Sequence, residues 1–297
     1  MEYLRTRAVG YTDTTFAPQT KRRAVPLFGL GAGWVAAATA HATASVYANV
    51  TQAYRPVDYA AVTPLGGVSR IDPHLKDAHG TTADLGVRGT LAGDRVRFDL
   101  GVFRLAYDDR VGLVTRTAPD GTVLTERTNV ANSVHQGLES YVEATPLAAR
   151  APDGTLRGAV TVFNALALTD AHYTTGAFRG NRVEYAPRTV ERVGLTLARG
   201  PLSTTFLTSY VSRAFGDANN TTRSEDAVVG IVPAYTVLDW SVAARVGQRF
   251  GARWRVQGGV NKVADRHYFT RRTDEYPGPG IIPALGRSVY LSLRLTP

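Results

Sequence analysis

The sequence predicts an all-β fold, an antiparallel up-and-down β-barrel that crosses a membrane. Apolar and polar residues alternate along most of the chain, and no segment shows a convincing helical period. The alternating segments are about ten residues long, close to the roughly 9–11 residues that a tilted strand needs to cross a bilayer. An average strand of a soluble protein has only about five or six residues. The connections between the segments alternate between short and long.

Four segments show the alternation most clearly. They are residues 96–102, 238–246, 254–260 and 289–295. In the last of them, every second residue from Val289 to Leu295 is aliphatic. Weaker alternation is present at residues 2–9, 28–39, 44–54, 81–91, 136–145, 158–170, 188–198 and 202–213. Because side chains of a strand point alternately to its two faces, these segments predict about twelve strands, each with one apolar face.

The connections place tight turns at one end of the sheet and long loops at the other. The short connections are Ala40–Ala42, Gly93–Asp94, Pro146–Arg157, Arg199–Leu202 and Gln248–Ala252. The long ones are Thr12–Pro26, Arg55–Gly80, Tyr107–His135, Asp170–Pro187, Phe215–Ala234 and Asn261–Arg287. Soluble domains rarely contain many loops this long, whereas outer-membrane barrels combine short periplasmic turns with long extracellular loops. Alternation alone does not separate a soluble barrel from a membrane barrel, but strand length and loop alternation favour the membrane.

The segment around residues 21–44 imitates a secretion signal. Lys21-Arg22-Arg23 precedes an apolar run, and Ala42-Thr43-Ala44 has the pattern of a cleavage site. Glycines at positions 29, 31 and 33 nevertheless alternate with larger apolar residues, which fits a strand better than a signal helix.

The composition excludes several classes of function. Cysteine is absent, which rules out disulfides, thiolate metal sites and thiol catalysis. No G-x-S-x-G, H-E-x-x-H or phosphate-binding glycine loop occurs, so we expect no enzyme and assign no catalytic residue. The 34 basic and 25 acidic residues give a net charge of +9, which suits nucleic acid, lipopolysaccharide phosphates or an anionic ligand without choosing among them.

The carboxyl-terminal residues 234–297 are the most specific part of the sequence. Tyr235–Ser241 (YTVLDWS), Gly259–Asp265 (GVNKVAD) followed by His267-Tyr268-Phe269, and Gly286-Arg287 resemble the last strands of TonB-dependent outer-membrane receptors. The wording YFTRR…YPGPGIIPA…GRSVY is similar to receptors of the ferric dicitrate type. Upstream, YANVTQAYRPVDYA, TNVANSVHQGLESYVEATPL and GNRVEYAPRTVERVGLTLARG resemble barrel segments of the same family.

This resemblance implies a plug domain inside a barrel of about 22 strands, which imports ferric chelates with energy transmitted by TonB through an amino-terminal box. We expect residues 1–297 to be the carboxyl-terminal part of such a barrel, about twelve strands, without signal peptide, box or plug. The expected location is the outer membrane of a Gram-negative bacterium. The expected partners are outer-membrane lipid, lipopolysaccharide, a ferric chelate such as ferric citrate and, in the intact receptor, TonB, but no nucleic acid. The chelate is cargo, and we expect no resident cofactor or metal.

Basic and aromatic residues on the long loops are the candidate ligand contacts. They are Arg179, Arg182, Tyr268, Arg271, Arg272, Tyr276 and Arg287. Guanidinium groups suit the several carboxylates of a ferric citrate complex, and tyrosines add hydrogen-bonding walls. The alternative is that these arginines bridge lipopolysaccharide phosphates or pair with loop acids.

Two other functions remain open from the sequence. The chain could close on itself as a small passive outer-membrane pore of about twelve strands. It could also be a soluble β-rich module that binds an anionic polymer.

Overall fold

The computed structural model describes residues 2–8, 19–57, 70–117, 123–154, 156–223, 227, 229–249, 252–273 and 280–296. These residues form eighteen strands. They contain no helix that could cross a membrane.

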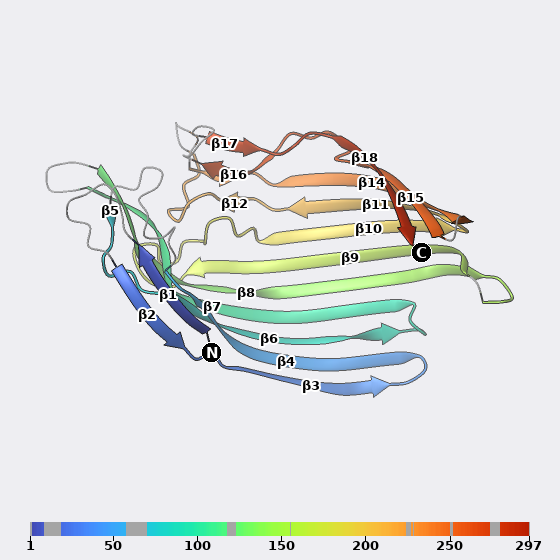
Figure 1. Ribbon diagram of the computed structural model, residues 1–297, viewed down its shortest axis with the longest axis horizontal. Helices are drawn as coiled ribbons and strands as arrows, with labels where there is room; N and C mark the ends of the chain where they lie inside the picture. Colours follow the sequence, from blue (N-terminus) through green and yellow to red (C-terminus); the bar gives the residue numbers. More distant parts are fainter. Residues whose placement is uncertain are drawn as a thin grey trace.

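Twelve of the strands form one large sheet. Figure 1 shows its long strands side by side. Eleven of them lie side by side: β3 (Gly29–Ala38), β4 (Ala42–Arg55), β6 (Ala78–Leu91), β7 (Val96–Thr117), β8 (Val123–Arg150), β9 (Leu156–Tyr173), β10 (Thr189–Arg199), β11 (Leu202–Val211), β14 (Tyr235–Arg249), β15 (Ala252–Asn261) and β18 (Ser288–Thr296). Each is antiparallel to its neighbours, and they follow chain order. The twelfth, β5 (Arg70–Ile71), pairs in parallel with β8. The expected up-and-down topology is confirmed.

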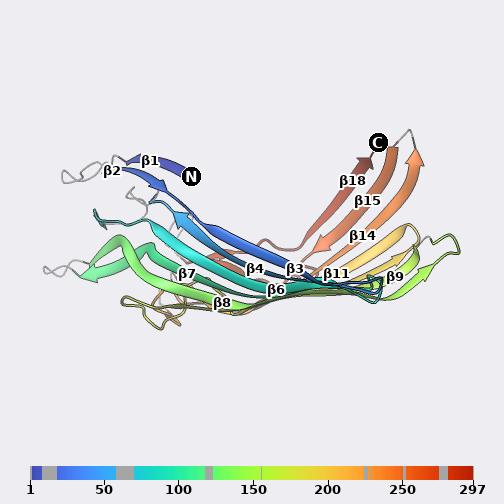
Figure 2. The ribbon, with the colours of Figure 1, turned by 90° about the horizontal axis from the view of Figure 1, so that it is seen from below.

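The sheet bends into an open trough (Figure 2). Its first and last strands are β3 and β18, and neither has a further strand beyond it in the described ranges. Both edges therefore present backbone groups that are available for pairing.

The remaining strands make three small two-stranded sheets. They are β1 (Glu2–Ala8) with β2 (Gln19–Val25), β12 (Ala214–Phe215) with β13 (Ile231–Val232), and β16 (Phe269–Thr273) with β17 (Gly280–Pro283). Of the segment 2–9, expected as a barrel strand, the described residues 2–8 thus belong to a separate hairpin, whose second strand lies in an expected loop. The hairpin carries the basic residues Arg5, Arg7 and Lys21-Arg22-Arg23. Such a charge density is costly on a lipid-facing strand, which explains why the hairpin stands apart from the barrel sheet.

Two expected connections are mostly strand. The ladder between β7 and β8 continues to the pair Thr117 and Val123, through irregularities beside Arg110, so most of the expected loop Tyr107–His135 is extended chain. At the other end, Pro146 lies within β8, where the ladder with β9 is irregular between Ala144 and Leu147. Proline has no N–H to donate, and an irregularity of this kind lets it remain in a strand.

The strand alternation gives the sheet one apolar and one polar face. Cross-strand pairing aligns Val102, Leu138 and Leu168 on one face, where they are 50%, 39% and 42% exposed. We call this the apolar face. Other exposed side chains on it are Leu30, Trp34, Val50, Leu85, Leu100, Val142, Val162, Val193, Leu197, Phe206, Trp240, Val289, Leu291, Leu293 and Leu295. This row of exposed apolar groups is the arrangement expected of a surface against lipid.

The opposite, polar face is held together by side chains that cross several strands. The Tyr47 ring on β4 lies over Gly86 on β6, and its hydroxyl donates to Asp99 Oδ1 on β7 at 2.9 Å. The Arg88 guanidinium lies 5.5 Å from the centre of the same ring. A Cβ atom at Gly86 would overlap the tyrosine ring, so glycine provides the space that this cross-strand contact needs.

We predict that Gly86→Ala lowers the free energy of unfolding by about 1–3 kcal/mol, because the Tyr47 ring has to move. Gly33→Ala is the matched control, since a Cβ there would meet no atom nearer than the Val46 carbonyl oxygen at 3.9 Å. Denaturant unfolding in detergent micelles measures both. Equal unfolding midpoints for the two variants would contradict the prediction, because they would show that the Tyr47 ring need not move to make room for a Cβ atom at position 86.

Candidate functional site

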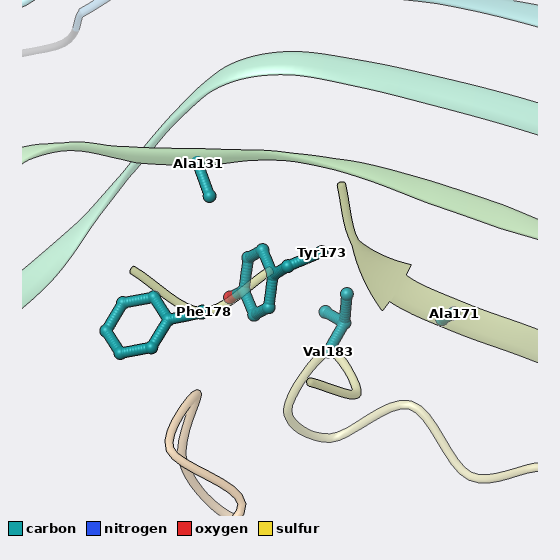
Figure 3. Close-up of a cluster of buried hydrophobic side chains, with 5 residues drawn as sticks. All are labelled: Ala131, Ala171, Tyr173, Phe178 and Val183. Carbon is teal, nitrogen blue, oxygen red and sulfur yellow. The ribbon is translucent and has the colours of Figure 1, made fainter. Parts of the chain in front are cut away.

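A small apolar core fixes the chain beyond β9 against the sheet. Tyr173, the last residue of β9, is almost fully buried. Figure 3 shows its ring between Phe178 and Val183, with Ala131 of β8 nearby. The turn returns through Gly180, whose φ is +87° and whose N–H donates to the Tyr173 carbonyl oxygen at 2.9 Å. This core holds the following residues, Val183 to Ala186, close to the loop end of β7 and β8.

The core positions an ion pair at its edge. The Tyr173 hydroxyl donates to Glu184 Oε2 at 2.7 Å, while Arg110 Nη2 donates to Glu184 Oε1 at 2.5 Å. Burial, together with the hydrogen bond to Glu184, raises the pKa of Tyr173, so the phenol keeps its proton and remains a donor. The Arg110 guanidinium also lies 5.8 Å from the Tyr173 ring centre. Glu184 therefore neutralises Arg110 and orients it.

A cavity of about 870 Å³ lies beside this ion pair. Its walls come from β4, β6, β7, β8 and β16, and from the chain that precedes β10. Its polar lining consists of Arg55, Tyr107, Arg110, Arg127, His135, Glu184, Tyr185 and Arg271. With four arginines and one carboxylate, the lining is strongly basic. We call this space the basic cavity.

Two of the cavity arginines are available to a ligand. Arg55 and Arg271 are exposed, and neither pairs with an acid in the part of the chain that the structure describes. Guanidinium groups bind carboxylates or phosphates through paired, charge-assisted hydrogen bonds. The basic cavity can therefore hold an anion with several oxygen atoms. Among the described residues, no group of three or more histidines and acids is placed to hold a metal ion.

The structure brings one of the residues singled out from the sequence, Arg271, into the basic cavity. Arg179 is exposed on the chain between β9 and β10. Arg182 lies near β9, where its Nη1 is 3.6 Å from Asp170 Oδ1. Burial and the neighbouring Arg188 lower the pKa of Arg182. Tyr276 lies outside the described residues.

The other three have local structural partners. Arg272 donates from Nη1 to the Ala227 carbonyl oxygen at 2.6 Å and from Nη2 to that of Ile231 at 2.9 Å. Arg287 Nη2 lies 3.3 Å from Asp265 Oδ2. Tyr268 stacks on Tyr235 with ring centres 4.2 Å apart. A ligand role stays a prediction for all seven residues. Arg272 in addition has a structural role, because it binds two backbone carbonyl groups.

The cavity lining also includes residues that were not predicted from the sequence: Arg55, Tyr107, Arg110, Arg127 and Tyr185. For Arg55 a signal was present: it continues the alternation of Tyr47, Asn49 and Thr51 and so falls on the polar face at the loop end. Arg110 and Arg127 lie within the expected loop Tyr107–His135, so the sequence did not indicate that both belong to the ladder between β7 and β8.

We predict that Arg272→Ala loosens the chain around residues 227–232, because two backbone carbonyl groups lose a charged donor. The local opening free energy should fall by about 1–3 kcal/mol. Hydrogen exchange of this segment measures the change, with Arg271→Ala as the control. Unchanged exchange in Arg272→Ala would contradict the structural role.

The loop beside Asp265 should respond to acid. Its carboxylate accepts hydrogen bonds from the Arg287 backbone N–H and guanidinium, which lower the pKa of Asp265 below 3.8. This stabilisation is present above the ordinary pKa and is lost as pH falls through the lowered one. The difference in Tm between the protein and its Asp265→Asn variant should therefore be largest near neutral pH and shrink below pH 3.8. A difference in Tm that grows as the pH falls would contradict this prediction.

Comparisons with known proteins agree with the barrel fold. A family described as "TonB dependent receptor-like, beta-barrel" matches residues 2–262. No curated protein matches the chain. Similar solved structures include the ferric citrate transporter FecA in its unliganded form (20% identity, TM-score 0.68, 93% of this chain and 39% of that one). The copper transporter OprC (16%, 0.65, 93% and 40%) and the ferric yersiniabactin uptake receptor FyuA from Yersinia pestis (18%, 0.63, 93% and 38%) are also similar.

These structures share the fold of the chain, which spans well under half of their length. The family match covers most of the chain and places it in the Gram-negative outer membrane, among receptors and transporters rather than enzymes. A soluble β-rich module that binds an anionic polymer, which the sequence left open, is therefore wrong. The chain belongs to the family of TonB dependent receptor-like β-barrels.

Proposed function

We propose that the chain is part of an outer-membrane receptor that imports a ferric chelate rich in carboxylates, such as ferric citrate, with energy supplied through TonB. The observation that carries this proposal is the basic cavity at the loop end of the polar face. It has the size of a small-molecule site, about 870 Å³, and a lining of four arginines.

The charge balance of the cavity favours a multiply charged anion. Glu184 pairs with Arg110, whereas Arg55 and Arg271 have no acidic partner among the described residues. A ferric citrate complex carries several carboxylates, each able to accept two hydrogen bonds from one guanidinium. Tyr107 and Tyr185 add aromatic walls with polar tips.

The exposed Arg179 is a second candidate contact. Arg182, Tyr268, Arg272, Arg287 and Tyr276 stay in the proposed ligand set, but the first four would have to exchange or share the local contacts described above. The chelate is the cargo, so the proposal includes no resident cofactor.

The proposed partners follow from the location and the sheet edges. Residues 1–297 would supply part of a larger barrel, whose other strands pair with β3 and β18. Outer-membrane lipid and lipopolysaccharide would surround the apolar face, and TonB would act on the intact receptor. We propose no nucleic-acid partner.

The test is binding and uptake of radioactive ferric citrate by cells that carry the intact receptor. We predict that the double variant Arg55→Ala/Arg271→Ala binds ferric citrate at least tenfold more weakly, because two charge-assisted contacts are lost. Arg157→Ala is the matched control, since this exposed arginine lies at the short-turn end.

Uptake should stop in cells without TonB, while binding at the surface persists. Uptake that continues without TonB would instead indicate a passive pore. Equal binding by the double variant and the protein would contradict the role of the basic cavity.

A further inference from the structure

A row of charged and polar side chains crosses the apolar face at the loop end of β7, β8 and β9. Cross-strand pairing aligns Arg104 with Gln136, and Gln136 with Asp170. The next row toward the short turns, two residues along each strand, consists of Val102, Leu138 and Leu168. Because each residue of a strand advances about 3.3 Å, the polar row lies roughly 7 Å from the aliphatic row.

The polar row carries excess positive charge. Arg104 Nη1 donates to Gln136 Oε1 at 2.8 Å, so its partner is uncharged. Asp170 is the shared neighbour of two arginines, with Oδ1 3.6 Å from Arg182 Nη1 and 3.8 Å from Arg188 Nη2. His172 Nδ1 lies 3.3 Å from Asp170 Oδ2. Asp170 therefore faces two guanidinium groups, and Arg104 adds a third positive charge that has no acidic partner in the described part of the chain.

These arginines have unused donors. The Arg188 side chain is 69% exposed. Arg182 Nη2 is buried and has no hydrogen-bond partner within the described part of the chain. The exposed Arg188 can therefore donate to an acceptor from outside the protein, whereas the buried Arg182 Nη2 adds an unpaired donor that such an acceptor does not reach.

An open cavity of about 560 Å³ lies where the two rows meet. Val102, Leu138 and Leu168 line its apolar side, and Gln136, Asp170 and Arg188 line its polar side. The cavity is therefore amphipathic: its polar side and its apolar side follow one another along the strand direction. Such a shape suits a molecule with an apolar chain and an anionic head.

We propose that this surface binds one phosphorylated lipid of the outer leaflet, the lipid A part of lipopolysaccharide, with a phosphate against Arg104 and Arg188 and an acyl chain along Val102, Leu138 and Leu168. The apolar face contacts hydrocarbon, and the long loops lie at the extracellular end in outer-membrane barrels. The polar row then lies at the level of the outer headgroups. Asp170 holds the neighbouring arginines in place, and the phosphate supplies the missing negative charge.

Charge complementarity and the aliphatic row together select the lipid over free phosphate. A free phosphate ion would use the arginines alone and gain nothing from the aliphatic side chains. An uncharged lipid would use the aliphatic row alone. The proposal rests on the outer-membrane location of the family and does not depend on the chelate.

The test uses the protein extracted from outer membranes in a mild detergent and freed of bound lipid. Native mass spectrometry then measures binding of three probes: bisphosphorylated lipid A, the same lipid without phosphates, and inorganic pyrophosphate. We expect binding of the bisphosphorylated lipid to exceed that of each other probe at least tenfold. In Arg104→Gln/Arg188→Gln it should fall at least tenfold, because both direct phosphate donors are lost.

Arg199→Gln is the matched control, since Arg199 belongs to the short-turn end of β10 and should leave lipid binding unchanged. Both replaced arginines are exposed, and heat-modifiable gel mobility checks that each variant is folded. A second variant, Leu138→Gln, should weaken lipid A binding and leave pyrophosphate binding unchanged.

Equal binding of the lipid with and without phosphates would overturn the proposal, as would pyrophosphate binding as tight as that of lipid A. Unchanged lipid binding in the double arginine variant would also overturn it. Ferric citrate binding should be the same in this variant as in the unchanged protein, so failure of the lipid proposal is distinguishable from failure of the proposed import function.

Discussion

The structure depends on one constraint: backbone N–H and C=O groups in hydrocarbon must find their partners within the protein. An antiparallel ladder satisfies this requirement for each strand that has a neighbour on both sides. Nine of the eleven long strands, from β4 to β15, have such neighbours. The outer edges of β3 and β18 do not, among the described residues, and each unpaired group in lipid costs several kcal/mol. Pairing of these edges is therefore the condition under which the sheet can lie in a membrane.

The same antiparallel ladder gives the sheet one apolar face and one polar face. Because side chains alternate, lipid contact on one face leaves the other free for polar groups, including the Tyr47–Asp99 contact and, toward the loops, the basic cavity. The cavity depends on extension of β7 and β8 beyond the point where the apolar alternation ends, since Arg110 and Arg127 lie on these extensions. The core around Tyr173 then brings Glu184 and Tyr185 to the same place.

Much of the large sheet could be predicted from the sequence. Its eleven long strands coincide with alternating segments, because burial against lipid imposes period two on one face. The hairpin of β1 and β2 was not predicted correctly, since β1 alternates like a barrel strand although its neighbour is highly charged. The extensions of β7 and β8 leave the lipid, so no apolar alternation marks them. Pro146 indicated a turn, because proline rarely occurs within a strand. The irregular ladder between β8 and β9 that tolerates it cannot be inferred from the sequence of β8 alone.

The candidate site was less accessible to sequence reasoning. The basic cavity combines residues from distant segments, such as Arg55, Arg127 and Arg271, and only the fold brings them together. Loop position selected Arg272 and Arg287 equally well, although the structure gives both of them protein partners. Residue type predicted the chemistry of the site, a set of guanidinium groups, but could not distinguish arginines with partners from arginines available to a ligand.

The fold and both proposals depend on contact between the apolar face and lipid. Trp34, Trp240 and Trp254, the three tryptophans of the chain, all belong to this face by strand register, and Trp34 is 69% exposed. Tryptophan fluorescence of the protein in vesicles of brominated lipid measures this contact. We predict strong quenching by bromine in the acyl chains and weak quenching by aqueous acrylamide. Strong acrylamide quenching without any effect of brominated lipid would contradict it.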